Sequence, residues 1–111
     1  MQIRPITETF HVSGQLAPTD IAELAASGYS MVICMRPDGE GSGQPDFSII
    51  EDAANAAGLK SCYLPVVPGS VPLEQAAKLK DLLKRTEGPV LAFCASGARC
   101  AGLYQMAQQL G

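Results

Sequence analysis

Short apolar runs alternate with helix-like segments along the whole chain, and this alternation limits the fold more than any other feature of the sequence. The apolar, strand-like runs lie at 10–16, 29–35, 59–66 and 89–93. Segments with helical spacing of apolar residues, or with helix start and stop signals, follow at 17–28, 47–58, 73–88 and 98–110. This β-α-β-α-β-α-β-α order predicts an α/β fold with a small, four-stranded, mainly parallel sheet and helices on both of its faces.

Length and charge narrow the class of protein. The 111 residues suit one domain, so we expect residues 1–111 to form a single domain. Because the sequence ends directly after the last predicted helix, we expect either one module of a larger protein or a C-terminally truncated domain. The net charge of -3, with no basic cluster beyond Lys84 and Arg85, argues against nucleic acid as a partner. The apolar runs are too short to span a membrane and no signal peptide precedes them, which predicts a cytoplasmic protein without membrane partners.

The cysteines are expected to be free thiols. They stand at Cys34, Cys62, Cys94 and Cys100, and three of them lie in or at the end of strand-like runs. Without a secretory signal, such cysteines indicate reduced thiols rather than a disulfide framework. No pair has the short spacing of a zinc site, and the one histidine, His11, is distant in the sequence. We therefore predict neither a metal nor any other cofactor.

Three segments that leave strand ends should form one rim. In parallel α/β sheets, ligands bind beyond the carboxyl ends of the strands. The segments in question are 36–43 (RPDGEGSG), 65–70 (PVVPGS) and 94–99 (CASGAR). The third joins an apolar strand to a helix, and it combines a cysteine, small residues and an arginine.

This third segment, Cys94 to Arg99, predicts an anion-binding loop with a nucleophile at its base. Its small residues, Ala95, Ser96, Gly97 and Ala98, let backbone N–H groups turn inward, and the following helix adds its N-terminus. Arg99 adds a guanidinium that can hold two anionic oxygens. The same positive field lowers the pKa of a thiol, so Cys94 would be a thiolate at neutral pH. The alternative is that Cys94 is one more small buried residue.

Cys100, in the first turn of the last helix, is either a packed small residue or a resolving thiol for Cys94.

The whole chain, this loop included, resembles a known family. The motifs that carry the likeness are FHVSGQ at 10–15, VICMRPDGE at 32–40, YLPVVPG at 63–69 and FCASGAR at 93–99. They resemble the phosphatase-like or sulfurtransferase domain of beta-lactamase hydrolase-like proteins, within the superfamily of dual-specificity phosphatases and rhodaneses. The resemblance implies the fold of cysteine phosphatases and rhodaneses, with the active loop between the last strand and the last helix.

The resemblance also separates two reactions. Cysteine phosphatases usually have five residues between Cys and Arg and a histidine before Cys, whereas this chain has four residues and Phe93. The shorter loop is similar to that of rhodaneses, in which the cysteine carries a persulfide. The position of the phosphatase general acid lies in 65–70 and holds no carboxylate, so Asp38 is the candidate acid. The alternative for Asp38 is a turn residue or an ion-pair partner of Arg36.

Two further departures from the relatives concern the loop itself. Cys100 stands where relatives have Ser or Thr, and Ala95 stands where they often have Arg. The first weakens hydrogen bonding to the departing thiolate, and the second weakens anion binding. The resemblance also implies fusion or association with metallo-β-lactamase-like, sulfide-oxidising proteins.

Sulfur transfer is therefore the leading functional prediction. Cys94 would take sulfur from a small sulfane-sulfur donor, hold it as a persulfide in the loop beside Arg99, and pass it to a thiol acceptor. The first alternative is hydrolysis of phosphomonoesters, as in protein-tyrosine and dual-specificity phosphatases, through a phosphocysteine with Asp38 as acid. The second is a non-catalytic persulfide or redox sensor that uses Cys94 and Cys100.

Overall fold

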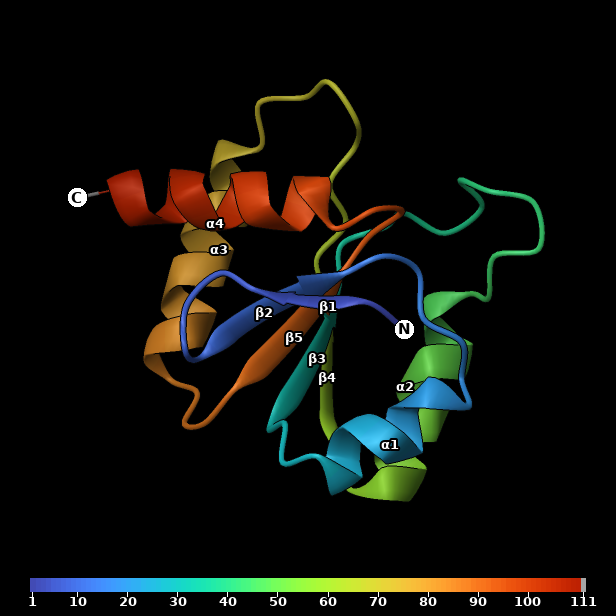
Figure 1. Cartoon of the computed structure of the whole chain (residues 1–111). Helices are drawn as coiled ribbons and strands as arrows, with labels where there is room; N and C mark the ends of the chain where they lie inside the picture. Colours follow the sequence, from blue (N-terminus) through green and yellow to red (C-terminus); the bar gives the residue numbers. More distant parts are fainter. Residues whose placement is uncertain (111) are drawn as a thin grey trace.

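A five-stranded sheet forms the centre of the structure, a computed structural model that describes residues 1–110 (Figure 1). Its strands are β1 (Ile3–Pro5), β2 (Phe10–Ser13), β3 (Met31–Cys34), β4 (Lys60–Tyr63) and β5 (Val90–Phe93). They lie in the order β1-β2-β5-β3-β4, with β1 antiparallel to β2 and every other pair parallel. The predicted α/β class, with its mainly parallel sheet, is confirmed.

The strand count differs from the prediction by β1, which the sequence analysis missed. This strand has only three residues and ends in Pro5, opposite His11 in the register. Proline has no backbone N–H to contribute to a sheet and normally argues against a strand. It is tolerated here because β1 lies at the edge of the sheet, where one side of the strand needs no hydrogen bonds.

Four helices cover the sheet, two on each face, as predicted (Figure 1). They are α1 (Asp20–Ala26), α2 (Phe47–Ala57), α3 (Leu73–Lys84) and α4 (Ala98–Gln109). The helices α1 and α2 pack on one face of the sheet, and α3 and α4 pack on the other. Within residues 1–110, none of these helices has the length and apolar character needed to cross a membrane.

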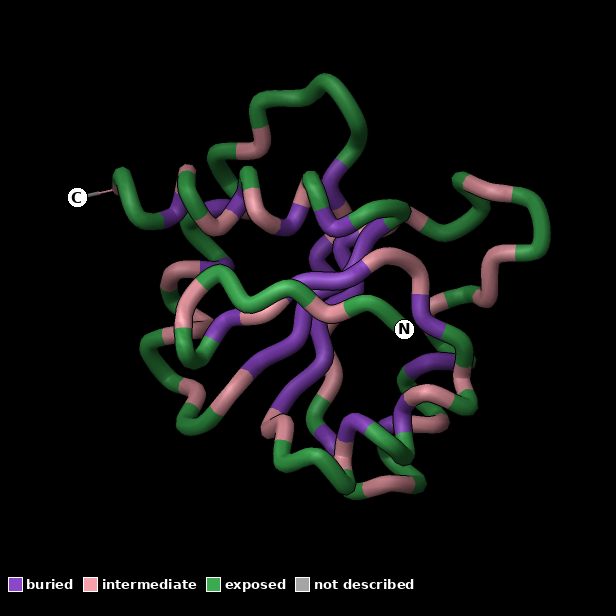
Figure 2. Tube along the Cα trace, viewed as in Figure 1, coloured by how far each residue is buried: buried purple, intermediate pink, exposed green. Residues whose placement is uncertain are grey.

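The sequence of the central strand β5 is apolar at every position because helices cover both faces of the sheet there. Leu91 and Phe93 point into the core beneath α1 and α2, whereas Val90 and Ala92 point into the core beneath α3 and α4. All four are buried, because successive side chains of a strand alternate between the faces and here both faces are covered (Figure 2). The same alternation places Cys94, the next residue, in the core below α4.

The loops that follow the parallel strands lie at one edge of the sheet, beside the start of α4 (Figure 1). The loops at 35–46 and 64–72 are largely exposed, whereas the loop at 94–97 begins in the buried core (Figure 2). The sequence predicted that three segments converge on this rim.

Candidate active site

Cys94 lies at the base of the loop between β5 and α4. Its side chain is buried, and its backbone N–H donates to the Ser13 carbonyl at 3.3 Å, which ties the start of the loop to β2. The loop then turns back over the sulfur, and the Gly97 N–H donates to Cys94 Sγ at 3.1 Å. Gly97 has a φ of 91°, a left-handed conformation that glycine adopts without steric cost. The predicted curvature of the loop at Gly97 is present.

The loop holds the Cys94 sulfur as a thiolate. A hydrogen bond from the Cys100 thiol and the backbone N–H groups of Cys100, Ser96 and Gly97 lower the pKa of Cys94 from 9.0 to about 4, against the opposing effect of burial. At neutral pH the sulfur therefore carries a negative charge inside a ring of donors. A charged and surrounded sulfur of this kind is the form in which cysteine acts as a nucleophile.

Cys100 is the thiol partner of Cys94. It is buried in the first turn of α4, in the same core cluster as Cys94. The hydrogen bond to the Cys94 thiolate, followed by burial, raises the pKa of Cys100, so this thiol keeps its proton. Cys100 therefore acts as a donor to Cys94 from the first turn of α4.

Arg99 joins the three segments that the sequence predicted to converge. Its Nη1 donates to the Val66 carbonyl at 2.8 Å and to Glu40 Oε2 at 2.8 Å. Its Nη2 donates to Glu40 Oε1 at 2.6 Å. Glu40 belongs to the 36–43 segment and Val66 to the 65–70 segment, so the convergence of these two segments on the loop of Cys94 is confirmed.

Glu40 is the rim residue that the sequence analysis missed. Its carboxylate contacts Arg99 and also accepts from Arg36 Nε at 3.0 Å, while Arg36 Nη1 donates to Gln15 Oε1 at 3.1 Å. Arg99 first, and then Arg36, lower the pKa of Glu40, and Glu40 in turn raises the pKa of Arg99. No sequence signal distinguished Glu40 from Asp38, because both stand in the same short polar segment.

The contacts of Arg99 leave one edge of its guanidinium open. Within residues 1–110, its Nη1 hydrogens and one Nη2 hydrogen have protein acceptors, whereas the Nε–H and the other Nη2–H have none. Two parallel N–H groups at one edge match two oxygens of a bound oxyanion. The charge of Cys94 also contributes to raising the pKa of Arg99, which places the guanidinium within electrostatic reach of the thiolate.

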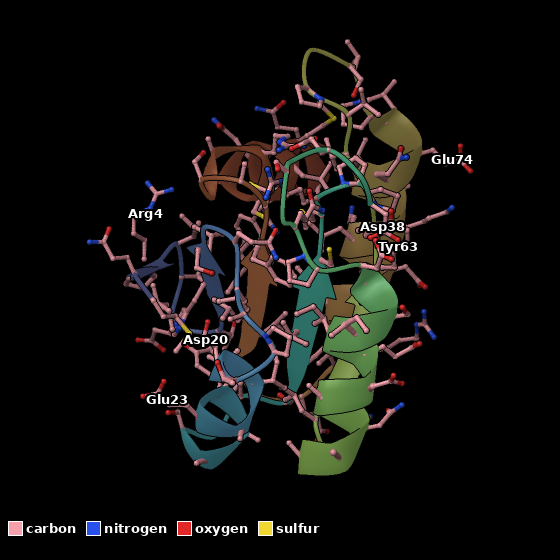
Figure 3. The ribbon with its side chains drawn as sticks, turned by 90° about the vertical axis from the view of Figure 1, so that its right-hand side faces the viewer. Arg4, Asp20, Glu23, Asp38, Tyr63 and Glu74 are labelled. Atoms are coloured by element: carbon pink, nitrogen blue, oxygen red, sulfur yellow. The ribbon has the colours of Figure 1, made fainter. Side chains whose placement is uncertain are left out.

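Asp38 has a role in the shape of the loop. Its Oδ1 accepts the Phe47 N–H at 2.8 Å, beside the start of α2, and its own N–H donates to the Tyr63 hydroxyl at 2.9 Å. Figure 3 shows Asp38 next to Tyr63. Its partner is not Arg36, which pairs with Glu40 instead. The proposed role of Asp38 as a general acid remains a prediction.

The remaining loop residues are placed as small spacers. Ala95 and Ser96 are exposed, and Ser96 Oγ accepts the Ala98 N–H at 3.4 Å.

Cys34 lies outside the site, on the opposite face of the sheet from Cys94, and burial raises its pKa to about 11. Among residues 1–110, the histidine, cysteine and acidic side chains form no group of three that could hold a metal ion.

The chain is similar to known proteins over nearly its whole length. Residues 2–111 match the family model described as "Beta-lactamase hydrolase-like protein, phosphatase-like domain". The chain is 33% identical over 105 residues to a beta-lactamase hydrolase-like protein of Agrobacterium fabrum, covering 95% of the chain and 24% of the relative. The chain thus spans about a quarter of the length of this relative.

Solved structures show the same fold. A candidate phosphatase from Neisseria meningitidis superposes with a TM-score of 0.83 and 31% identity, over 96% of this chain and 78% of the other. Tk-PTP, in a mutant form, superposes with a TM-score of 0.67 and 19% identity, over 86% of this chain and 61% of the other. The second likeness concerns the fold alone.

Proposed function

Because the chain belongs to the family of the phosphatase-like domain of beta-lactamase hydrolase-like proteins, we propose that it is a cysteine-dependent phosphatase that hydrolyses phosphomonoesters through a phosphocysteine. One observation carries this proposal. The Cys94 thiolate lies inside a ring of N–H donors, and Arg99 beside it keeps two N–H groups open. A nucleophile and a seat for oxyanion oxygens are thus combined in one loop.

In the first step the phosphoryl group of the ester binds over the loop. Its oxygens accept hydrogen bonds from the loop N–H groups and from the open edge of Arg99. Cys94 Sγ attacks phosphorus, so an S–P bond forms while the P–O bond to the leaving group breaks. The leaving oxygen departs with the bonding electron pair.

In the second step a water molecule attacks the phosphocysteine. The O–P bond forms, the S–P bond breaks and inorganic phosphate is released, with the proton of water passing to solvent. Cys94 leaves as a thiolate, and the Cys100 thiol and the Gly97 N–H stabilise that charge. Because the Cys94 pKa is about 4, the thiolate is a good leaving group at neutral pH.

The rim carboxylates Glu40 and Asp38 do not readily supply a proton to a leaving group, so we expect phosphate esters of acidic alcohols to be the preferred substrates. Glu40 is held ionised by Arg99 and Arg36, which makes it a poor proton donor. The Oδ1 atom of Asp38 is bound to the Phe47 N–H. The substrate therefore needs a leaving group that departs without a proton. Aryl phosphates provide one, because the pKa of a phenol, near 10, is lower than that of an alkyl alcohol.

The test is the release of phosphate from para-nitrophenyl phosphate and from an alkyl phosphate by the purified protein and by Cys94→Ser. We expect turnover of the aryl ester, little turnover of the alkyl ester, and none of either by Cys94→Ser. Cys62→Ser, a change at a partly buried thiol on β4, is the matched control and should keep full activity. Equal turnover by Cys94→Ser would overturn the proposal.

Sulfur transfer is the second candidate, and two observations favour it. The loop has four residues between Cys94 and Arg99, and a protonated thiol, Cys100, contacts Cys94. In this reaction Cys94 would attack the sulfane sulfur of glutathione persulfide, release glutathione and pass the sulfur to a thiol acceptor.

Intact mass spectrometry of the protein and of Cys94→Ser, each after incubation with glutathione persulfide, tests sulfur transfer. A gain of one sulfur atom by the parent alone would support a sulfur carrier, and no gain would remove this candidate. The redox-sensor alternative rests on the same thiol pair and stays a prediction.

A further inference from the structure

A polar hollow of about 360 Å³ lies against the loop that follows β5. Its lining includes Gln2, Arg4, Gly14, Gln15, Ala95 and Ser96. This volume falls within the roughly 300–1,000 Å³ of small-molecule pockets. Because Ala95 and Ser96 also belong to the anion-binding loop, the hollow and the proposed phosphate seat share one wall.

Close backbone packing fixes this shared wall. A Cβ added to Gly14 would lie 3.0 Å from the Ala95 carbonyl oxygen, so the chain after β2 passes directly against the loop. Cys94 is tied to the same segment through the Ser13 carbonyl. The hollow therefore has a defined place relative to the Cys94 loop.

Arg4 is the one charged side chain among the lining residues of this hollow, which also include Met1. Its Nη2 lies 2.9 Å from the position that a Cβ on Gly97 would take, beside the start of α4. Figure 3 shows its side chain extending from β1 to the level of α4. The hollow contains no carboxylate among its lining residues, and the N-terminal end of α4 adds a partial positive charge.

Arg4 differs from the other arginines of the chain. Arg36 and Arg99 pair with Glu40, and Arg85 pairs with Asp81. Within residues 1–110, no carboxylate lies within ion-pair distance of Arg4. Its side chain is exposed, so the N–H donors of its guanidinium are open to a ligand.

We propose that Arg4 forms a second anion subsite, and that the preferred substrates are phosphomonoesters of small molecules that carry a second anionic group, a carboxylate or a phosphate. This inference rests on the proposed phosphatase function. The scissile phosphate occupies the loop beside Arg99, and the second anionic group enters the hollow beside Arg4. Gln2, Gln15 and Ser96 provide further polar walls for it.

The kinetic test compares phenyl phosphate with meta- and para-carboxyphenyl phosphate at low ionic strength, since salt screens an exposed charge. The parent should prefer at least one carboxylated ester. Arg4→Gln should reduce this preference roughly tenfold, the effect of one charge-assisted hydrogen bond, and leave phenyl phosphate unchanged within about twofold. Arg4→Lys should retain part of the preference, and Arg85→Gln, which removes an equal charge from α3, should retain all of it.

A binding measurement separates this inference from the proposed function. Calorimetric titration of Cys94→Ser with the same esters, with and without Arg4→Gln, reports the preference in the absence of turnover. If the parent hydrolyses none of the three esters but binding shows the Arg4-dependent preference, the proposed function fails and the subsite stands. A preference that Arg4→Gln leaves unchanged, an equal loss for all esters, or no binding at all would overturn the subsite.

Discussion

At the scale of single residues, the ionisation of Cys94 depends on Cys100. The Cys100 thiol is the largest of the influences that lower the pKa of Cys94 to about 4. Hydrogen bonds to charged groups contribute about 1.5–3 kcal/mol, so Cys100→Ala should raise the pKa of Cys94 by about 1–2 units. In the parent, alkylation of Cys94 by iodoacetamide should stay fast as pH falls from 8 and decline only as pH approaches about 4.

Peptide mass spectrometry of alkylation at a series of pH values checks this prediction. Cys100→Ala should shift the decline to higher pH, because the thiolate loses a donor that stabilised it. Cys62→Ala is the control, since Cys62 lies on β4 at the far edge of the sheet and should leave the Cys94 profile in place. Identical profiles for the parent and Cys100→Ala would contradict the role assigned to Cys100.

Glu40 is expected to position Arg99 rather than to block it. Glu40→Gln keeps one amide oxygen as an acceptor, but its NH₂ group cannot accept from the guanidinium. The open edge of Arg99 should then lose its orientation, raising KM for aryl phosphates roughly tenfold with a smaller change in kcat. Glu40→Asp should restore part of the loss, whereas a gain in kcat/KM would show that Glu40 competes with substrate.

The matched control for Glu40→Gln is Glu74→Gln on α3. Glu74 is an exposed carboxylate that pairs with Lys78, at the edge of the molecule in Figure 3. Glu74→Gln removes the same charge as Glu40→Gln, but at a position that does not contact the rim. Steady-state kinetics of the two variants under one set of conditions therefore separates the contact with Arg99 from the change in net charge.

At the scale of elements, the turn into α4 requires glycine. Gly97 has a φ of 91°, and a Cβ there would lie 2.9 Å from Arg4 Nη2 and 3.4 Å from the Ser13 carbonyl. Gly97→Ala should therefore cost about 1–2 kcal/mol of stability from backbone conformation alone. Gly102 is the control within the same helix, because a Cβ there meets nothing within 4 Å. Gly102→Ala should stabilise the protein by about 0.5–1 kcal/mol.

Urea unfolding of the two glycine variants measures this contrast. We expect changes in the free energy of unfolding of opposite sign. Equal effects from the two substitutions would show that the conformation at Gly97 is not constrained as described.

The loop between β3 and α2 gives the corresponding test for Asp38. In Asp38→Asn the amide oxygen can still accept the Phe47 N–H, so the loop should keep its shape while the acid is lost. We expect kcat for para-nitrophenyl phosphate to change less than about threefold and its pH profile to stay in place, because this leaving group departs without a proton. A loss of the alkaline limb of the pH profile would instead identify Asp38 as the general acid.

The secondary structure followed from local sequence patterns, with one exception. Apolar runs and helix signals sufficed for β2 to β5 and for all four helices. The central strands β3 and β5 are apolar throughout because both faces of the sheet are covered there, whereas the edge strand β4 is only partly buried. The strand β1 carries no such pattern. Its residues Ile3–Pro5 pair only with β2, so the strand depends on a partner that is already in place.

At the scale of the whole molecule, topology explains which parts of the site were predictable. Parallel strands end at one edge, so the convergence of three segments followed from the predicted parallel direction of the strands. The Arg99–Glu40 contact joins residues 59 apart in sequence, and nothing local distinguishes Glu40 from Asp38. Arg4 reaches the loop only through β1, the strand that the sequence analysis missed.

The most direct test of the proposed phosphatase mechanism traps the covalent intermediate on Cys94. The purified protein is mixed with para-nitrophenyl phosphate, quenched in acid within the first turnovers, and examined by intact and peptide mass spectrometry. Hydrolysis through a phosphocysteine predicts a gain of one phosphoryl group on the peptide that contains Cys94, and no gain in Cys94→Ser. Release of phosphate by the parent without any phosphorylated Cys94, in an assay that detects a phosphocysteine standard, would contradict it.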